Sequence, residues 1–188
     1  MQTSAYRREG ETWLIEIRLR ELRQLFNHLD PAPFREKDLD PAAEAYIEDA
    51  VREIGPRQPC KLVVHLPDAE RASADARTLP EALAHYFEYR AWKSKLELRR
   101  LLTRGLLSLG IGLAFMFACL SLISWLTARG SNGVITEGLV VIGWVALWRP
   151  AEIFLYDWWP IRRRQRRFEF IAQMPVEIRS QPVPMESR

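Results

Sequence analysis

The feature that most constrains this chain is an uninterrupted apolar run from Gly105 to Leu126. It holds 22 residues and no charged side chain. As an α-helix it would be about 33 Å long at 1.5 Å per residue, slightly more than the ~30 Å hydrocarbon core of a bilayer. We therefore expect this segment to cross a membrane as a helix.

A second apolar segment follows a polar turn expected at 127–133. Its uncharged part, 138–148, would be about 16 Å long as a helix, which is too short to cross alone. The second span must therefore cover about 134–156, and Pro150 predicts a kink in it. The aromatic stretch 157–160 predicts its end at the membrane surface. The charged residues that it includes or borders on are Glu137, Arg149 and Glu152.

Cations gather on both outer flanks of the two predicted spans. Residues 89–104 are expected to form a basic juxtamembrane helix, and 157–188 contain a second basic cluster, whereas the turn holds only Arg129. Because positive residues beside a span stay in the cytoplasm, both termini are expected there. The flanking cations are also candidates for contact with anionic lipid, although a role as topology signals explains them equally well. They are Arg99, Arg100, Arg104, Arg162, Arg163, Arg164, Arg166 and Arg167.

The first 88 residues predict a small cytoplasmic α/β domain. Alternating apolar residues predict a strand at 13–19, and a β-branched apolar run predicts another at 61–66. Helices are expected at 21–27 and at 41–54, the latter between a capping aspartate and a terminating glycine. Residues 1–10 show neither pattern and are expected to fray.

A long helix is expected to connect this domain to the membrane. Thr78 to Glu81 has the form of a capping box with proline at the first helical position, so the helix is predicted to begin at Pro80. No glycine or proline then interrupts the chain before Gly105. After the second span, the alternation at 176–178 predicts an edge strand that returns to the sheet. The expected fold is thus an α+β membrane protein with two to three strands, a long continuous helix and a two-span hairpin.

Small residues predict how the two spans pack. They allow the close backbone approach by which membrane helices associate. On the first span they are Gly110, Ala114, Ala118 and Ser121, and on the second Gly138, Gly143 and Ala146. We interpret this stripe as the contact between the two spans, and the alternative is contact with a second copy or with a foreign helix.

Charged residues inside the second span are the sharpest candidates for a function in the membrane. A charge at the bilayer centre costs on the order of 3 kcal/mol, so such residues are usually paired or functional. Arg149 and Glu152 are three residues apart and are predicted to pair on one helix face. The simpler interpretation is that both reach toward the cytoplasmic interface and Glu137 toward the outer one. A proton or ion path around Glu137 and Arg149 would need several copies of the chain.

No catalytic motif is found in the sequence. GxSxG, HExxH and a glycine-rich phosphate loop are absent, so no catalytic residue is assigned. The polar groups available to an enzyme are His28, Asp30, Asp38 and His65. Glu81, His85 and Glu88 share a helix face, but a dedicated metal site needs ligands from more than one element, so neither a metal nor a cofactor is expected.

Three segments resemble a family of uncharacterised bacterial inner-membrane proteins with a small cytoplasmic domain and a two-span hairpin. They are LRQLFNHLDPAPFREKDLDPAAEAYI (22–47), LVVHLP (62–67) and WRPAEIFLYDWWP (148–160). The resemblance implies the bacterial cytoplasmic membrane and carries no known activity or functional residue.

These observations favour a membrane-anchored adaptor or accessory subunit without enzymatic activity, which holds a cytoplasmic partner at the inner membrane. Its expected partners are the bilayer, a protein or a second copy, and anionic lipid. No nucleic-acid recognition motif is present, so no nucleic acid is expected. The alternatives are an enzyme acting on a lipid or membrane-adjacent substrate, and a homo-oligomeric ion or proton path.

Overall fold

The computed structural model of the chain describes residues 6–55, 58–130 and 133–181. The chain divides into two compact units. Residues 1–92 together with 165–188 make up the first, which we call the folded unit. Residues 93–164 make up the second, the hairpin unit.

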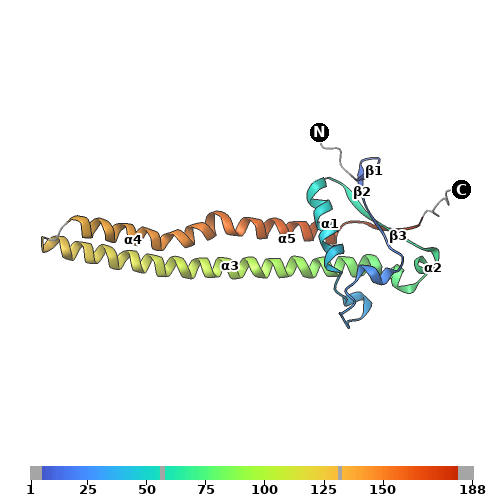
Figure 1. Ribbon diagram of the computed structural model, residues 1–188, viewed down its shortest axis with the longest axis horizontal. Coiled ribbons are helices and arrows are strands. Elements are labelled where there is room, and N and C mark those ends of the chain that lie inside the picture. The colour runs from blue at the N-terminus through green and yellow to red at the C-terminus, as the bar shows by residue number, and fades with distance from the viewer. Residues whose placement is uncertain (1–5, 56–57, 131–132, 182–188) are drawn as a thin grey trace. The chain divides into compact units, whose positions relative to one another are not determined.

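A four-stranded sheet organises the folded unit (Figure 1). Its strands are β1 (Arg7–Glu9), β2 (Thr12–Arg18), β3 (Cys60–Leu66) and β4 (Val176–Ser180), in that order across the sheet. β1 runs antiparallel to β2, and the other two pairings are parallel. The predicted return strand is confirmed, because β4 pairs with β3 from Leu62↔Val176 to Leu66↔Ser180. The predicted α+β class is confirmed as well.

Strand β1 is where the sequence prediction failed. The expectation that residues 1–10 fray is wrong for Arg7–Glu9, which pair with β2 through a two-residue connection at Gly10 and Glu11. Gly10 has φ +62°, which suits the first central position of a type II′ hairpin turn. All three β1 residues are exposed, so their polar sequence carries no alternation from which a strand could be predicted.

Helices and 3-10 turns cover the sheet. α1 (Pro41–Ile54) is confirmed, with the Asp40 carboxylate accepting the Ala42 N–H at 2.9 Å. The helix expected at 21–27 is a 3-10 turn, η1 (Leu22–Leu25), and a second turn, η2 (Phe34–Glu36), follows it. A short α2 (Asp68–Arg71) precedes α3.

α3 spans Ala74–Ala128, so the predicted start at Pro80 is wrong. Ser73 caps the helix instead, with its hydroxyl accepting the Ala76 N–H at 3.1 Å. Ala76 and Leu79 are fully buried in the core, and that burial holds a helical turn upstream of the proline. Tertiary packing therefore outweighs the local capping signal at Thr78, and the helix begins upstream of it.

One hydrophobic core lies on a single face of the sheet. Ile15, Leu62 and Val64 point into it from the strands. The helices contribute Ile47 and Val51 from α1, Phe87 from α3 and Phe168 from α5 (Trp158–Ala172), all nearly fully buried. Burying such a side chain contributes about 1.5–3 kcal/mol, so segments from both ends of the sequence stabilise this core.

Carboxylates of α1 fasten that helix to its neighbours. The Tyr86 hydroxyl donates to Glu44 Oε2 at 2.7 Å, and Arg90 also pairs with Glu44. Arg167 donates to Glu48 Oε1 from Nη2 at 2.6 Å and from Nε at 3.1 Å. α1 is thus tied to both α3 and α5.

Ion pairs cover the opposite face of the sheet. Lys61 Nζ lies 2.7 Å from Glu9 and 2.6 Å from Glu177, and Arg179 contacts the same two carboxylates. Hydrogen bonds from Arg179 and Lys61 lower the pKa of Glu177 to about 2. Val63 is fully buried on this face, so the charges close over apolar side chains.

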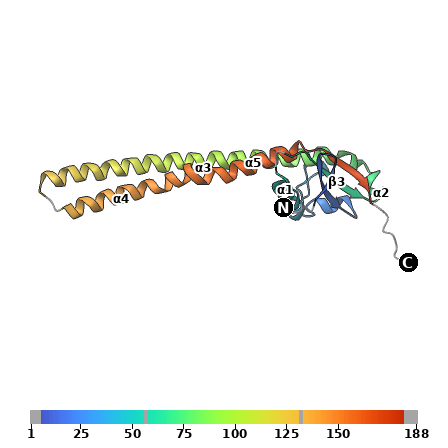
Figure 2. The same cartoon turned by 90° about the horizontal axis from the view of Figure 1, so that it is seen from above.

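The hairpin unit consists of two helical stretches that lie side by side in both views (Figures 1 and 2). Beyond α3 it contains α4 (Gly133–Glu152), a π-helical turn, η3 (Ile153–Asp157), and the beginning of α5. Only 11% of the most apolar stretch of α3 and 17% of that in Gly133–Ala172 are buried. Two helices are therefore long and apolar enough to cross a membrane, and their apolar side chains face outward.

Helical structure continues beyond the second predicted span, through Asp157–Pro160 to Ala172. The aromatic stretch therefore does not end the helix, and the end of the span at the membrane surface stays a prediction. The disturbance expected from Pro150 takes the form of the π-helical turn that follows it. Trp158 Nε1 donates to the Phe154 carbonyl at 2.8 Å, which satisfies a backbone group in this turn.

Glycines on a different face from the predicted stripe bring the two helices together. A Cβ on Gly112 would lie 2.9 Å from the Ala146 carbonyl oxygen, and one on Gly105 would lie 2.8 Å from Ile153 Cγ2. Pro150 has no N–H to donate to Ala146 four residues before it, so that carbonyl is free to face the bare Cα of Gly112.

The predicted packing stripe is wrong for α3. Gly110, Ala114, Ala118 and Ser121 are all exposed, and a Cβ on Gly110 or Gly138 would meet nothing within 4 Å. The buried positions Gly105, Gly112 and Cys119 are instead seven residues apart. A seven-residue repeat keeps one seam facing a nearly parallel or antiparallel partner, whereas residues four apart drift around the helix.

A graded series of glycine substitutions tests this packing. Gly112→Ala should destabilise the hairpin by about 1–3 kcal/mol, because the new methyl group meets a backbone oxygen that cannot swing away. Gly143→Ala should cost less, since the nearest atom is the flexible Met116 Sδ at 2.8 Å. Gly110→Ala is the control and should leave stability unchanged or raise it. Thermal unfolding of the full chain in mild detergent, followed by tryptophan fluorescence, measures the order, and equal midpoints for Gly112→Ala and Gly110→Ala would contradict it.

Candidate functional site

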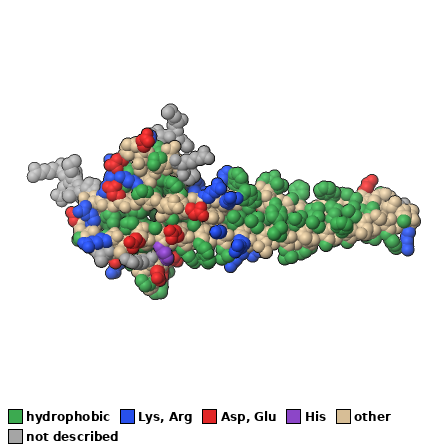
Figure 3. Space-filling model, turned by 180° about the vertical axis from the view of Figure 1, so that it is seen from behind, with side chains coloured by type: hydrophobic (Ala, Val, Ile, Leu, Met, Phe, Trp, Pro, Cys, Tyr) green, Lys and Arg blue, Asp and Glu red, His purple; other side chains and the backbone are tan. Residues whose placement is uncertain are grey.

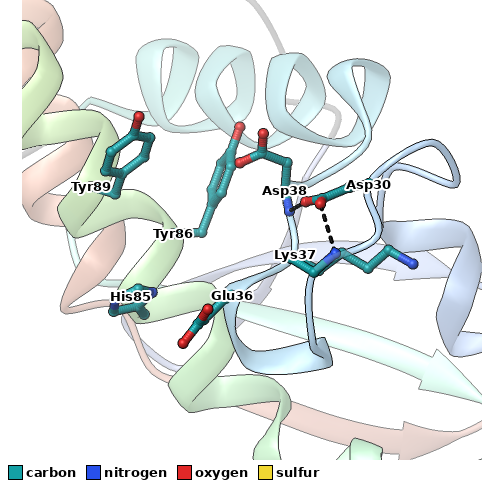
Figure 4. A pocket seen from close by; sticks show the side chains of 8 residues that line it. Asp30, Glu36, Lys37, Asp38, His85, Tyr86 and Tyr89 are labelled. Atoms are coloured by element: carbon teal, nitrogen blue, oxygen red, sulfur yellow. Dashed lines mark hydrogen bonds between the residues drawn. The ribbon is translucent and has the colours of Figure 1, made fainter.

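A cleft of about 330 Å³ opens on the folded unit between the loop around η2 and the beginning of α3 (Figure 4). Three of its lining side chains are carboxylates and two are tyrosines. The lining residues are Asp30, Ala32, Glu36, Lys37, Asp38, His85, Tyr86 and Tyr89.

Asp30 shapes the loop side of the cleft. Its carboxylate accepts the Ala32 N–H at 2.9 Å and the Asp38 N–H at 2.7 Å, so it spans the loop from one end to the other. These backbone hydrogen bonds lower the pKa of Asp30 below its usual 3.8 and keep it ionised. The Asp38 carbonyl in turn accepts the Asn27 N–H at 2.8 Å. Asp30 is therefore a structural member of the cleft.

α3 supplies the opposite wall through His85, Tyr86 and Tyr89. Burial, followed by the hydrogen bond to Glu44, raises the pKa of Tyr86, so its phenol stays protonated and directed at α1. Tyr89 is half exposed and stacks on Trp92 with ring centroids 6.0 Å apart. In Figure 4, Glu36 from η2 and His85 from α3 lie at the same end of the cleft.

The charge of the cleft is negative. Three carboxylates, Asp30, Glu36 and Asp38, face one ammonium group, that of Lys37. Aromatic faces beside carboxylates favour cationic guests, since both the ring quadrupole and the carboxylate attract positive charge. The cleft is thus suited to a lysine or arginine side chain.

The structure brings together only part of the predicted enzyme group. Asp30 and Asp38 line the cleft, but His28 and His65 do not. His65 is buried with Nε2 3.1 Å from Glu16 Oε1, and its Nδ1 has no hydrogen-bond partner among the described residues. Burial raises the pKa of Cys60 to about 11, so this thiol is not a nucleophile near neutral pH.

Metal-binding side chains do not converge. Among the described residues, no group of three or more His, Cys, Asp and Glu side chains is close enough to hold a metal ion. Of the acidic and histidine residues on one face of α3, His85 lines the cleft and Glu81 and Glu88 do not.

The charged residues predicted inside the second span separate into two places. Arg149 Nη1 donates to Glu152 Oε2 at 3.0 Å and lies 3.4 Å from Asp157 Oδ2, while Trp148 Nε1 donates to Glu152 Oε1 at 2.9 Å. Glu137 lies twelve residues before Arg149, about 18 Å away along α4. The predicted pairing of Arg149 with Glu152 is confirmed, whereas Glu137 and Arg149 are not brought together.

The eight arginines proposed for lipid contact differ in how they are held. Arg167 is bound by Glu48 in the folded unit, and Arg164 is paired with Glu97 in the hairpin unit. Arg162 and Arg163 lie over the rings of Trp158 and Trp159, at 5.8 and 4.8 Å from their centroids. Six of the eight are exposed, namely Arg99, Arg100, Arg104, Arg162, Arg163 and Arg166.

Comparison with protein-family models, with curated proteins and with solved structures finds no match to this chain. The resemblance to a family of bacterial inner-membrane proteins therefore stays a prediction.

Sequence reasoning missed Glu36, Tyr86 and Tyr89 as cleft residues. Tyr86 and Tyr89 lie three residues apart on a helix, which placed them on one face, but nothing local indicated which segment covers that face. Glu36 belongs to a proline-rich loop, and its position depends on the Asp30 hydrogen bonds. The signal that could have found Glu36 is its position between Asp30 and Asp38 in one short segment of the chain.

Two substitutions distinguish the structural role of Asp30 from that of Asp38, whose carboxylate accepts no backbone hydrogen bond among the described residues. Asp30→Ala should lower the thermal midpoint and increase proteolysis within 28–38, because two backbone N–H groups lose their acceptor. Asp38→Ala is the control and should leave both unchanged. Since the folded pKa of Asp30 is depressed, its stabilising effect is present above pH 3.8 and is lost as pH falls below it, so the two variants should converge in acid. Equal midpoints at neutral pH would refute the structural role of Asp30.

Proposed function

We propose that this protein is a membrane-anchored adaptor that holds a cytoplasmic protein partner at the bilayer. The observation that carries the proposal is the contrast between its two parts. The folded unit closes a hydrophobic core of its own, whereas the hairpin unit exposes large apolar side chains along both helices (Figure 3). Exposed apolar surface of this extent is stable in lipid and not in water.

The connectivity supports a hairpin that enters and leaves on one side of the membrane. The chain leaves the folded unit after Trp92 and returns to it at Gln165, because β4 pairs with β3. Both ends of the hairpin therefore belong to one folded body, which requires an even number of crossings. With arginines on both flanks, the positive-inside rule supports a cytoplasmic location for that body and for both termini. This topology and the family resemblance together support the bacterial inner membrane as the location.

The cleft of the folded unit supports the adaptor function. Glu36, Asp38 and Tyr89 all line the cleft. Trp92 stacks on the Tyr89 ring and so extends the aromatic surface beside the two carboxylates. Tyrosine and tryptophan are enriched among residues that dominate protein–protein binding energy. We propose that the partner presents a basic segment with a lysine or arginine that enters this cleft.

The alternatives receive less support from the geometry. For an enzyme, the cleft contains carboxylates and an imidazole, but Asp30 is committed to the loop and Tyr86 to Glu44. For a proton path, Glu137 and Arg149 lie at different levels of α4. We therefore propose a binding function in preference to a catalytic or conducting one.

Reporter fusions test the proposed topology. Alkaline phosphatase is active only outside the cytoplasm, so a fusion after Gly130 in the turn should be active and a fusion at the C-terminus inactive. We expect the turn fusion to be the active one because the positive residues flank the ends of the two spans that lie away from the turn; the fold alone does not predict the orientation. Activity at the C-terminus alone would contradict the proposed orientation, and activity at both points would contradict the two-span arrangement.

Affinity purification of the full chain in mild detergent, from cells that make it, tests the adaptor function. A stoichiometric protein partner should copurify. Glu36→Lys should reduce its recovery at least about tenfold, because the charge reversal repels a basic segment at the rim of the cleft.

Glu11→Lys is the matched control, since it makes the same change at an exposed acid outside the cleft, and it should leave recovery unchanged. Recovery of a clean chain with no stoichiometric partner would refute the adaptor function. Equal recovery with both variants would show that the partner binds elsewhere.

A further inference from the structure

A groove of about 510 Å³ runs along the hairpin unit where α3 meets α4. One α4 residue and six α3 residues line it. They are Arg104, Leu107, Ser108, Ile111, Gly112, Phe115 and Ala146. Gly112 and Ala146 meet at one edge of the groove, where the backbone of Gly112 approaches the Ala146 carbonyl.

The groove has the length of one leaflet. Its α3 residues occupy a continuous strip of one helix face from Arg104 to Phe115, which rises about 16 Å. Half of a ~30 Å hydrocarbon core is about 15 Å. Arg104 immediately precedes the uncharged run Gly105–Leu126, and Phe115 lies near the middle of that run. The strip therefore extends from the cytoplasmic boundary to the bilayer centre.

The chemistry changes along the strip from cationic to apolar. Arg104 makes no ion pair with any residue in the ranges 6–55, 58–130 and 133–181, unlike Arg149 and Arg164. Ser108 has no hydrogen-bond partner among those residues either, whereas Ser121 and Ser124 donate to carbonyls four residues back at 2.8 and 3.0 Å. Beyond Ser108 only apolar groups line the groove.

We propose that this groove binds one anionic phospholipid of the cytoplasmic leaflet. The phosphate lies at Arg104, the Ser108 hydroxyl donates to an ester or phosphate oxygen, and one acyl chain follows Leu107, Ile111 and Phe115 toward the bilayer centre. The inference rests on the proposed insertion of the hairpin in a membrane.

A lipid fits the groove better than a second helix does. Close helix packing needs small residues that bring backbones together. Gly110, Ala114, Ala118 and Ser121 are exposed small residues of α3, and Gly110 lies on the face opposite Gly112. The groove instead carries Leu107, Ile111 and Phe115 with a cation at one end, which is the pattern of a headgroup and chain.

Native mass spectrometry of the full chain in mild detergent tests the proposal. The probes are dioleoyl phosphatidylglycerol and dioleoyl phosphatidylcholine, which share acyl chains and differ in net charge. The wild-type chain should retain one phosphatidylglycerol in preference to phosphatidylcholine. Arg104→Gln should weaken phosphatidylglycerol binding about five- to tenfold and abolish the preference, and Arg104→Lys should retain most of it.

Two further variants make the result specific to the groove. Arg99→Gln removes a cation on another face of the same helix and should change binding by less than about twofold. Ser108→Leu fills the groove and should weaken both lipids equally. Unchanged binding by Arg104→Gln, an equal loss in Arg99→Gln, or a stable dimer that excludes lipid would overturn the proposal.

Carbonate extraction of membranes separates this inference from the proposed function. A chain released by carbonate is not an integral membrane protein, and that result would overturn both. A chain that stays in the membrane but shows no preference for phosphatidylglycerol would overturn the lipid site alone.

Discussion

The parallel pairing of β4 with β3 is the contact on which the rest of the architecture depends. It joins two segments that lie on either side of the hairpin in the sequence, and it completes the sheet. The core closes by the same step, because Phe168 of α5 packs beside Phe87 of α3 with ring centroids 6.0 Å apart. The hairpin is thus an insertion in the connection between two neighbouring strands, and this connectivity supports both of its ends lying on one side of the membrane.

Within the hairpin, one proline and one glycine act together. Pro150 deprives the Ala146 carbonyl of its usual helical donor, and Gly112 lets that carbonyl lie against the neighbouring helix. In lipid there is little hydrophobic drive for helices to associate, so close packing of this kind carries more of the association energy. Gly112 also lines the groove in which we infer a phospholipid. The same position would therefore affect both the packing of the spans and the lipid site.

Acidic side chains of the folded unit serve two different purposes. Glu44 and Glu48 accept hydrogen bonds from neighbouring helices, and Asp30 accepts them within its own loop. Loss of any of these carboxylates should destabilise the fold. Glu36 and Asp38 line the cleft and are available to a bound partner. A substitution at Glu36 should therefore change partner binding and leave the hydrogen bonds of Glu44, Glu48 and Asp30 intact.

Local composition and period are enough to predict several features of this protein. The apolar run Gly105–Leu126, the capped helix Pro41–Ile54, strands β2 and β3, and the pairing of Arg149 with Glu152 all follow from neighbours in the chain. Even the return strand β4 was predictable from its alternation. These elements are set by hydrophobic periodicity and by side chains three or four residues apart.

Contacts between segments distant in the sequence set where those elements meet. Burial of Ala76 and Leu79 moved the start of α3 upstream of Pro80, and pairing with β2 made a strand of the polar segment Arg7–Glu9. The choice of Gly112 over Gly110 as the contact between the spans depended on the crossing of two helices. The cleft arose because hydrogen bonds to Asp30 held a loop opposite Tyr86 and Tyr89. Each of these depends on a partner distant in sequence, whose position no local pattern encodes.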